Sequence, residues 1–196
     1  ASHNPWGDNG FKPVIGDIPL IGANIDRLWA YVSERKMAVG NGHVVEVNVI
    51  DDYLKKVKSY FDKSGTIRIV IDSGNGCCGP LAPKLFRELG YDVVDIFSDP
   101  DGHFPNRGPD TSIPKNLEKL GEKVREVKAA FGVAYDGDGD RIGVVDERGQ
   151  CIRNDLIFVL FIRRFLTGKQ GVVVYDIKLS DIVPQAARMA GCTPLM

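Results

Sequence analysis

Six consecutive residues in the second half of the chain carry the side chains best suited to chemistry. Three acids alternate with two glycines, and an arginine closes the run: Asp136, Gly137, Asp138, Gly139, Asp140 and Arg141. Three carboxylates this close repel one another at neutral pH, so the segment is costly unless a cation lies among them. Side chains that alternate along an extended strand lie about 6–7 Å apart, which is too far for one ion. The two glycines allow the backbone to curl until the carboxylates converge.

A hard divalent cation suits this acidic loop (residues 136–141). Mg²⁺, with oxygen ligands at about 2.0–2.1 Å, is favoured because it leaves positions for water or a phosphate oxygen. Two other interpretations stay open. The first is a solvated acidic turn between two strands. The second is a calcium loop of the EF-hand type, with Asp136 at position 1 and Glu147 at position 12. Arg141 then stands where that loop needs glycine, and the flanking segments resemble strands rather than helices.

A glycine-rich turn (residues 74–79) forms a second candidate ligand site. It reads Gly-Asn-Gly-Cys-Cys-Gly between a predicted strand and a predicted helix, and Asp95 follows about 20 residues later. This pattern is typical of a dinucleotide-binding turn, and it keeps open the hypothesis of a binding module in place of an enzyme. Asp72 precedes the glycines, where it would repel a pyrophosphate, so close packing of the chain is the preferred explanation of the turn.

The composition is that of an ordinary globular chain. It has 196 residues, 43% of them hydrophobic, and a formal net charge of −1, enough for one or two cores. The near-neutral charge offers no basic surface for nucleic acid or an anionic membrane. No apolar run approaches the roughly 20 residues that span a bilayer. The four cysteines lack zinc-ligand spacing and suggest reduced thiols in a cytoplasmic protein: Cys77, Cys78, Cys151 and Cys192.

The elements that must position these residues begin with a polar loop that ends at Lys12. A short strand over 11–15, a helix over 24–38, and a strand or linker over 44–50 follow. Asp51 is expected to cap a helix that carries Leu54, Val57 and Phe61.

From residue 66 onwards, predicted strands and helices alternate. The strands are expected over 66–72, 91–97, 131–135, 142–146 and 171–175, and the helices over 80–89, from Pro114, over 154–166 and over 180–190. This order predicts α/β sandwich domains with mixed, largely parallel sheets. The acidic loop then lies at the carboxyl end of a strand, where open α/β sheets bind ligands.

Two motifs together resemble the α-D-phosphohexomutase family, and most closely its phosphomannomutase/phosphoglucomutase branch. One is Ser-His-Asn-Pro at residues 2–5 with Asn-Gly-Phe-Lys at residues 9–12, and the other is the acidic loop. Phe-Pro-Asn at 104–106 and Gly-Val-Ala-Tyr at 132–135 are similar to that branch too. The resemblance implies an isomerase that moves phosphate between O1 and O6 of a hexose. The reaction would use a phosphoserine and a hexose 1,6-bisphosphate, and the partners would be small sugar phosphates.

The resemblance also implies a role for each matching residue. Ser2 would carry the transferable phosphoryl group, His3 and Asn4 would position it, and Lys12 would act as the general base. Mg²⁺ would bind the three aspartates of the acidic loop together with an oxygen of the phosphate on Ser2.

Two further cations would contact the substrate. Arg141 would bind the transferred phosphate, and Lys178 is similar to a contact from the family's third domain, although residues 179–181 depart from the family pattern. The family has four domains, and the expected boundaries here are 1–48 for the end of the first domain, 49–150 for the second and 151–196 for the beginning of the third. We therefore expect a fragment that is inactive by itself.

Overall fold

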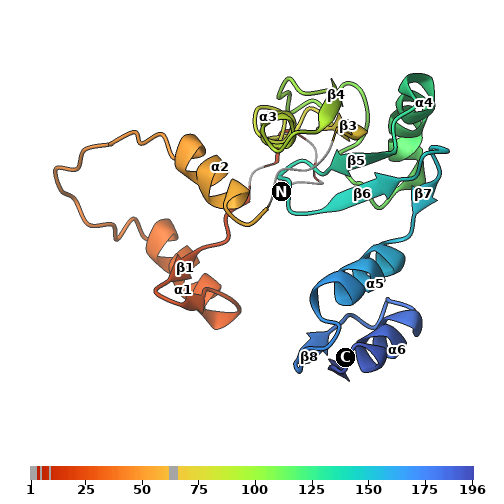
Figure 1. The fold of residues 1–196 in the computed structure, drawn as a ribbon. Coiled ribbons are helices and arrows are strands. Elements are labelled where there is room, and N and C mark those ends of the chain that lie inside the picture. Colours follow the sequence, from red (N-terminus) through yellow and green to blue (C-terminus); the bar gives the residue numbers. More distant parts are fainter. Residues whose placement is uncertain (1–3, 5, 9, 62–65) are drawn as a thin grey trace.

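The centre of the fold is a five-stranded sheet, labelled β3 to β7 in Figure 1. The computed structural model describes residues 4, 6–8, 10–61 and 66–196. The strands are β1 (Val14–Ile15), β2 (Ile18–Pro19), β3 (Arg68–Asp72), β4 (Asp92–Ile96), β5 (Phe131–Tyr135), β6 (Ile142–Val145), β7 (Cys151–Ile152), β8 (Val172–Val174) and β9 (Thr193–Leu195). The helices are α1 (Ala23–Ser33), α2 (Ile50–Lys58), α3 (Ala82–Glu88), the 3₁₀ helix η1 (Pro114–Leu117), α4 (Glu118–Val127), α5 (Asn154–Phe165) and α6 (Ile182–Met189).

The sheet has a parallel half and an antiparallel half. Its strand order is β4-β3-β5-β6-β7. β3 pairs in parallel with both β4 and β5, whereas β5 pairs antiparallel with β6, and β6 antiparallel with β7. The prediction of a mixed, largely parallel sheet is confirmed. The short strand β7 was not predicted, because two residues are too few to show a periodic pattern.

Helices cover both faces of this sheet. Neighbouring residues of a strand point to opposite faces, so Val70 of β3 packs with Leu120 and Val124 of α4. Ile69 and Ile71 instead join the cluster that includes Ala82 of α3. The predicted α/β sandwich is therefore confirmed for this part of the chain, and the carboxyl ends of β4, β3 and β5 share one edge.

Several helix ends differ from the predictions for local reasons. Asp51 does not cap α2, because the helix already begins at Ile50, and the side chain of Asn48 accepts a hydrogen bond from the N–H of Ile50 at 3.0 Å. The helix predicted over 24–38 stops at Ser33, since Arg35 adopts a left-handed conformation with φ of 52°. Pro114 opens a turn of 3₁₀ helix before α4 begins.

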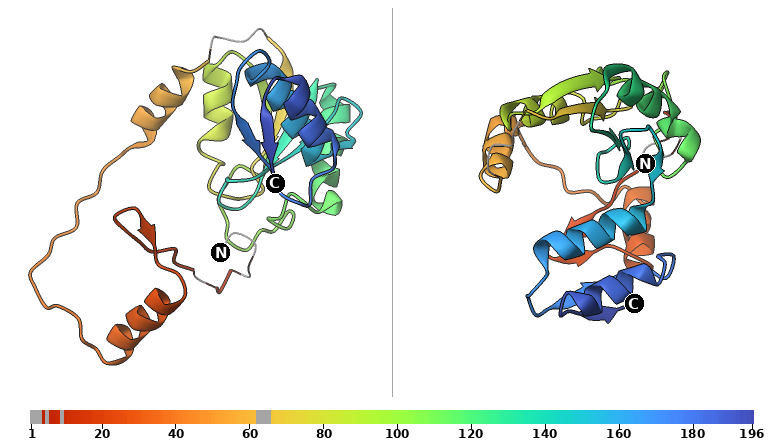
Figure 2. Two further views of the ribbon diagram at one scale, coloured as in Figure 1. Left: turned by 90° about the horizontal axis from the view of Figure 1, so that it is seen from below. Right: turned by 45° about the vertical axis from the view of Figure 1, so that its right-hand side comes forward.

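The segment before the sheet makes few contacts with it. The hairpin β1–β2 and α1 contain no buried residue, and residues 34–49 form no helix or strand. Figure 2 shows this stretch running away from the sheet and returning at α2. Leu54, 2% exposed, anchors α2, and Lys58 forms an ion pair with Glu88 of α3. The alternative of a strand over 44–50 is wrong, and a linker takes its place.

The segment from α5 to β9, residues 154–196, builds a second small unit. β8 and β9 pair in parallel, and α5 and α6 pack on them through a cluster centred on Ile162 and Val183. β9 was not predicted, although it completes the strand–helix–strand order that the sequence begins. In the part of the chain that the structure describes, no helix combines the length and apolarity needed to cross a bilayer.

The glycines of the glycine-rich turn allow close packing of backbone. A Cβ atom on Gly79 would lie 1.8 Å from the carbonyl oxygen of Ser98, after β4. A Cβ atom on Gly74, which has φ of 53°, would lie 2.4 Å from the guanidinium carbon of Arg107. Protein atoms therefore occupy the space over these glycines, in agreement with the packing explanation and not with a pyrophosphate cradle.

This packing predicts different outcomes for two Gly→Ala substitutions. Gly79→Ala should lower the free energy of unfolding by about 1–3 kcal/mol, because the backbone around Ser98 must move. Gly102→Ala is the matched control, since a Cβ atom there meets nothing within 4 Å, and its effect should stay within about 0.5 kcal/mol. Urea denaturation followed by circular dichroism measures both, and equal stabilities would contradict the packing explanation.

Candidate functional site

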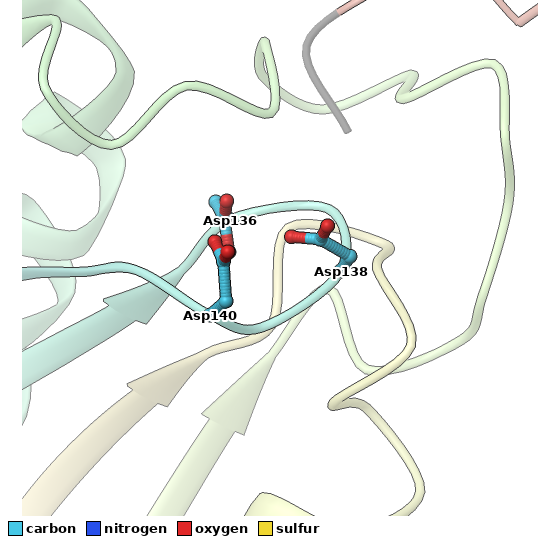
Figure 3. Close-up of side chains that lie close together, drawn as sticks. All are labelled: Asp136, Asp138 and Asp140. Carbon is cyan, nitrogen blue, oxygen red and sulfur yellow. The ribbon is translucent and has the colours of Figure 1, made fainter. Parts of the chain in front are cut away.

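Three carboxylate groups converge directly after β5. Asp136, Asp138 and Asp140 each contribute one oxygen, and these three atoms all lie within 4.8 Å of one another. Figure 3 shows the three side chains turned toward a common space from the loop that joins β5 to β6. Asp136 is fully buried, whereas Asp138 and Asp140 are exposed. The set therefore combines one firmly held ligand with two that face solvent.

The backbone of the acidic loop closes on itself to bring the acids together. The N–H of Asp136 donates to the carbonyl of Arg141 at 3.2 Å. In return, the N–H of Arg141 donates to Oδ1 of Asp136 at 3.1 Å. Gly139 has φ of 76°, a conformation that favours glycine. The curl predicted from the alternating glycines is present.

Burial and mutual repulsion shift the pKa values of two of the three acids, Asp136 and Asp138. Burial raises the pKa of Asp136, and the hydrogen bond from the N–H of Arg141 offsets this only in part, while the charges of Asp138 and Asp140 raise it further. Desolvation acts in the same direction on Asp138, but hydrogen bonds with the Asp136 side chain and the Asp140 backbone lower the pKa of Asp138. A cation among the three carboxylates would offset their mutual repulsion.

The donor set fits a hard divalent cation. Carboxylate oxygens are the ligands that Mg²⁺ and Ca²⁺ prefer, and Mg²⁺ commonly binds few carboxylates and keeps other positions for water or phosphate. Among the described residues, the acids close enough to share an ion do not include Glu147. The loop is also flanked by β5 and β6 and not by helices. Both observations argue against the EF-hand interpretation.

A buried arginine, Arg107, joins the ends of β3 and β5, directly before the acidic loop. Nε of Arg107 lies 3.0 and 2.9 Å from the two carboxylate oxygens of Asp72, at the end of β3. Its Nη2 donates to the carbonyl of Tyr135, the last residue of β5, at 2.7 Å. The side chains of Arg107 and Asp72 are 3% and 0% exposed. Burial raises the pKa of Asp72, and the hydrogen bond and charge of Arg107 oppose that rise.

The sequence pattern does not identify Arg107 as part of the site. Asp72 is the one residue whose position indicates that such a cation must exist, because a buried acid at the end of an apolar strand needs a positive partner. That partner lies 35 residues further along the chain, within the irregular loop between β4 and η1, where no periodicity indicates which residue turns inward.

Two predicted substrate contacts line neighbouring hollows between the sheet and the C-terminal unit. Lys178 lines one of about 340 Å³, together with Arg153 and Asp155. Arg141 lines the second, of about 300 Å³, and the two hollows share Thr111, Ser112 and Asn154. Nε of Arg141 lies 3.6 Å from a carboxylate oxygen of Asp140. Lys178 and Arg141 therefore line adjoining hollows, and Arg141 lies beside Asp140.

The N-terminal motif is described only in part. Ser2 and His3 lie outside the residues that the structure describes, and Lys12 is exposed. Trp6, which follows the motif, contacts His103 with ring centroids 4.9 Å apart and ring planes tilted by 37°. His103 belongs to the same loop between β4 and η1 as Arg107, so this contact places Trp6 against a loop at the carboxyl edge of the sheet.

Related proteins match the chain over most of its length. A family model described as "Phosphoglucomutase/phosphomannomutase, alpha/beta/alpha domain II" matches residues 50–149. A phosphomannomutase/phosphoglucomutase of Pseudomonas putida is 38% identical over the whole chain, and a phosphoglucomutase of Neisseria meningitidis serogroup B is 38% identical over 93% of it. The chain spans 42% and 40% of the lengths of these two relatives.

Solved structures agree with this similarity. A phosphoglucomutase/phosphomannomutase family protein from Burkholderia thailandensis superimposes on 99% of the chain with a TM-score of 0.91 and 36% identity, and the match covers 43% of that protein. A structure described as a "putative phosphomannomutase" from Thermus thermophilus superimposes on 79% of the chain and 37% of its own length, with a TM-score of 0.67 and 25% identity.

Removal of one aspartate should weaken metal binding selectively. We expect Asp138→Asn to lower the Mg²⁺ affinity at least about tenfold, since losses of that size follow even from changes behind the metal ligands. Glu147→Gln is the matched control, because this exposed acid is a ligand only in a calcium loop. Isothermal titration calorimetry measures both. A loss of Mg²⁺ affinity in Glu147→Gln but not in Asp138→Asn would contradict the assignment of the cation site to the three aspartates.

Removal of Arg107 should destabilise the fold. Arg107→Met leaves the Asp72 carboxylate buried without its cation and should lower the free energy of unfolding by about 3–5 kcal/mol. The double variant Asp72→Asn/Arg107→Met should recover part of the loss, because no charge then stays buried. Urea denaturation compares the variants, with the exposed Arg148→Met as control. A double variant no more stable than Arg107→Met would show that the charge is not the cause.

Proposed function

This chain belongs to the phosphoglucomutase/phosphomannomutase family, and from that premise we propose that it supplies the phosphoserine loop and the metal site of a phosphohexomutase. The enzyme moves a phosphoryl group between O1 and O6 of glucose or mannose through a hexose 1,6-bisphosphate. The convergence of Asp136, Asp138 and Asp140 within 4.8 Å carries the proposal. It supports a divalent cation, for which we propose Mg²⁺, at the carboxyl edge of the sheet.

Ser2 is the proposed carrier of the phosphoryl group. A free serine hydroxyl is a weak nucleophile, and a standing phosphoserine avoids the need to activate it in each cycle. The phosphate adds a charge of about −1.5 to −2, which needs a cation nearby. When bound, Mg²⁺ neutralises phosphate charge and withdraws electrons from the transferred group. The contact between Trp6 and His103 supports a position of the N-terminal loop near that cation.

The other side chains orient the group and move the proton. Phosphoryl transfer depends mainly on positioning and charge stabilisation. Arg141 offers the planar donors that bind phosphate in two places at once, and Lys12 accepts the proton of the attacking sugar hydroxyl. His3 positions the phosphoserine. Lys178 binds the substrate from the hollow that it lines, and the sugar phosphate lies between the sheet and the C-terminal unit.

The proposed domain limits are 1–48, 49–150 and 151–196, in a cytoplasmic enzyme of the relatives' length. The chain spans less than half of those relatives, and a reaction that returns phosphate to the other end of the sugar needs contacts on every side of it. We therefore expect no mutase turnover from the 196 residues alone.

Phosphorylation of Ser2 tests the proposal. A protein of the relatives' length that contains this chain, treated with glucose 1,6-bisphosphate and Mg²⁺, should gain about 80 Da, and peptide mapping should place the phosphate on Ser2. Ser2→Ala should lose both the label and the mutase activity, whereas Ser33→Ala, an exposed serine of α1, should keep both. A label on another residue, full activity in Ser2→Ala, or turnover by the 196-residue chain would contradict the respective part of the proposal.

A further inference from the structure

Two adjacent cysteines lie against the acidic loop and have no part in the proposed reaction. Cys77 and Cys78 occupy the glycine-rich turn, between β3 and α3. Cys77 is exposed and Cys78 is half-buried. Burial, and then the neighbouring Cys77, raise the pKa of the Cys78 thiol to about 11. The other two thiols lie elsewhere: Cys151 is exposed on β7, and the buried Cys192 donates to the carbonyl of Lys169 at 3.4 Å.

The contact between the glycine-rich turn and the acidic loop leaves no free space. The N–H of Cys77 donates to the carbonyl of Gly137 at 3.1 Å. A Cβ atom on Gly139 would lie 2.3 Å from Sγ of Cys78 and 3.8 Å from Sγ of Cys77. A Cβ atom on Gly76 would lie 2.7 Å from the carbonyl oxygen of Gly137. Both sulfur atoms therefore lie near Gly139, and the backbone of the glycine-rich turn contacts Gly137.

This arrangement makes the shape of the acidic loop depend on the chemical state of the sulfurs. Any atom bonded to Sγ of Cys78 on the side of Gly139 must displace the loop, because the contact is already close. A bond between the two sulfurs has the same effect by another route. Adjacent Cα atoms are about 3.8 Å apart, whereas disulfides usually join Cα atoms about 4.4–6.8 Å apart. A Cys77–Cys78 bridge is therefore strained, and because both thiols are free, forming it must move at least one of the sulfur atoms that lie near Gly139.

We propose that Cys77 and Cys78 form a modification site for small disulfides, and that its oxidation weakens cation binding by the acidic loop. The inference rests on the metal site of the proposed function. Cys77, the exposed thiol, attacks one sulfur of the small disulfide and releases one thiol. Cys78 then attacks the sulfur of Cys77 and releases the second. The two cysteines lose two electrons and two protons, which the small disulfide gains as it becomes two thiols.

The coupling works in both directions. If bridging lowers the affinity for Mg²⁺ by some factor, saturation with Mg²⁺ must oppose bridging by the same factor. Changes behind metal ligands commonly alter affinity by about 10–100-fold, and we expect a loss of about tenfold here. The reciprocal effect gives a second measurement, which does not depend on catalysis.

The test compares the reduced and oxidised chain. The 196-residue chain is treated with oxidised glutathione, and intact mass and peptide mapping identify the Cys77–Cys78 bridge or a mixed disulfide at either residue. Calorimetry with Mg²⁺ should show about tenfold weaker binding after oxidation, and dithiothreitol should restore it. In glutathione redox buffers, saturating Mg²⁺ should shift the bridging equilibrium toward the thiols by the same factor.

Two variants separate this effect from general damage. Cys151→Ser removes a distant exposed thiol and should keep the redox effect on affinity. Cys77→Ser/Cys78→Ser should bind Mg²⁺ like the reduced chain and lose all response to oxidised glutathione, with circular dichroism as the check on folding. Equal Mg²⁺ affinity of the reduced and fully modified chain, or a response that survives in the double variant, would overturn the inference alone. Failure of the reduced chain to bind Mg²⁺ would overturn the metal site and the inference together.

Discussion

The ion pair between Arg107 and Asp72 is the interaction on which the edge of the sheet depends. It joins the ends of two neighbouring parallel strands, because the guanidinium contacts Asp72 of β3 and the carbonyl of Tyr135 in β5. Both side chains are buried, so neither charge is solvated without the other. The acidic loop starts at the residue after Tyr135. Its first residue is therefore held in place by Arg107, which lies in the irregular loop between β4 and η1.

The contacts of Arg107 oppose the electrostatic repulsion among the three carboxylates of the acidic loop. Asp136, Asp138 and Asp140 repel one another, and repulsion alone would open the loop. Three features resist it: the reciprocal hydrogen bonds between Asp136 and Arg141, the left-handed Gly139, and the tight contact of the glycine-rich turn. The three carboxylates are therefore held close together by the surrounding chain itself.

Much of the sheet and the centre of the site could be predicted from local sequence. A few residues are enough to predict β3 and β5 from their apolar runs. The same holds for the curled loop, which the alternation of acid and glycine over residues 136–140 predicts. Arg107 could not be predicted, because its role arises from a contact 35 residues away. β7 and β9 are too short to show a period. The end of α1 depends on the left-handed Arg35, a conformation that sequence rarely marks in a residue other than glycine.

The antiparallel pairing of β5 with β6 has a consequence for motion. Tyr135 and Ile142 face each other directly across the ladder, so both ends of the acidic loop are fixed to one sheet. If β5 were instead followed by a crossover helix, the far end of the acidic loop would be attached to that helix and not to the sheet. A hinge elsewhere in the protein would therefore transport all three aspartates as a single rigid body. Such a motion would change how far the three carboxylates lie from the other parts of the protein, and leave their mutual geometry intact.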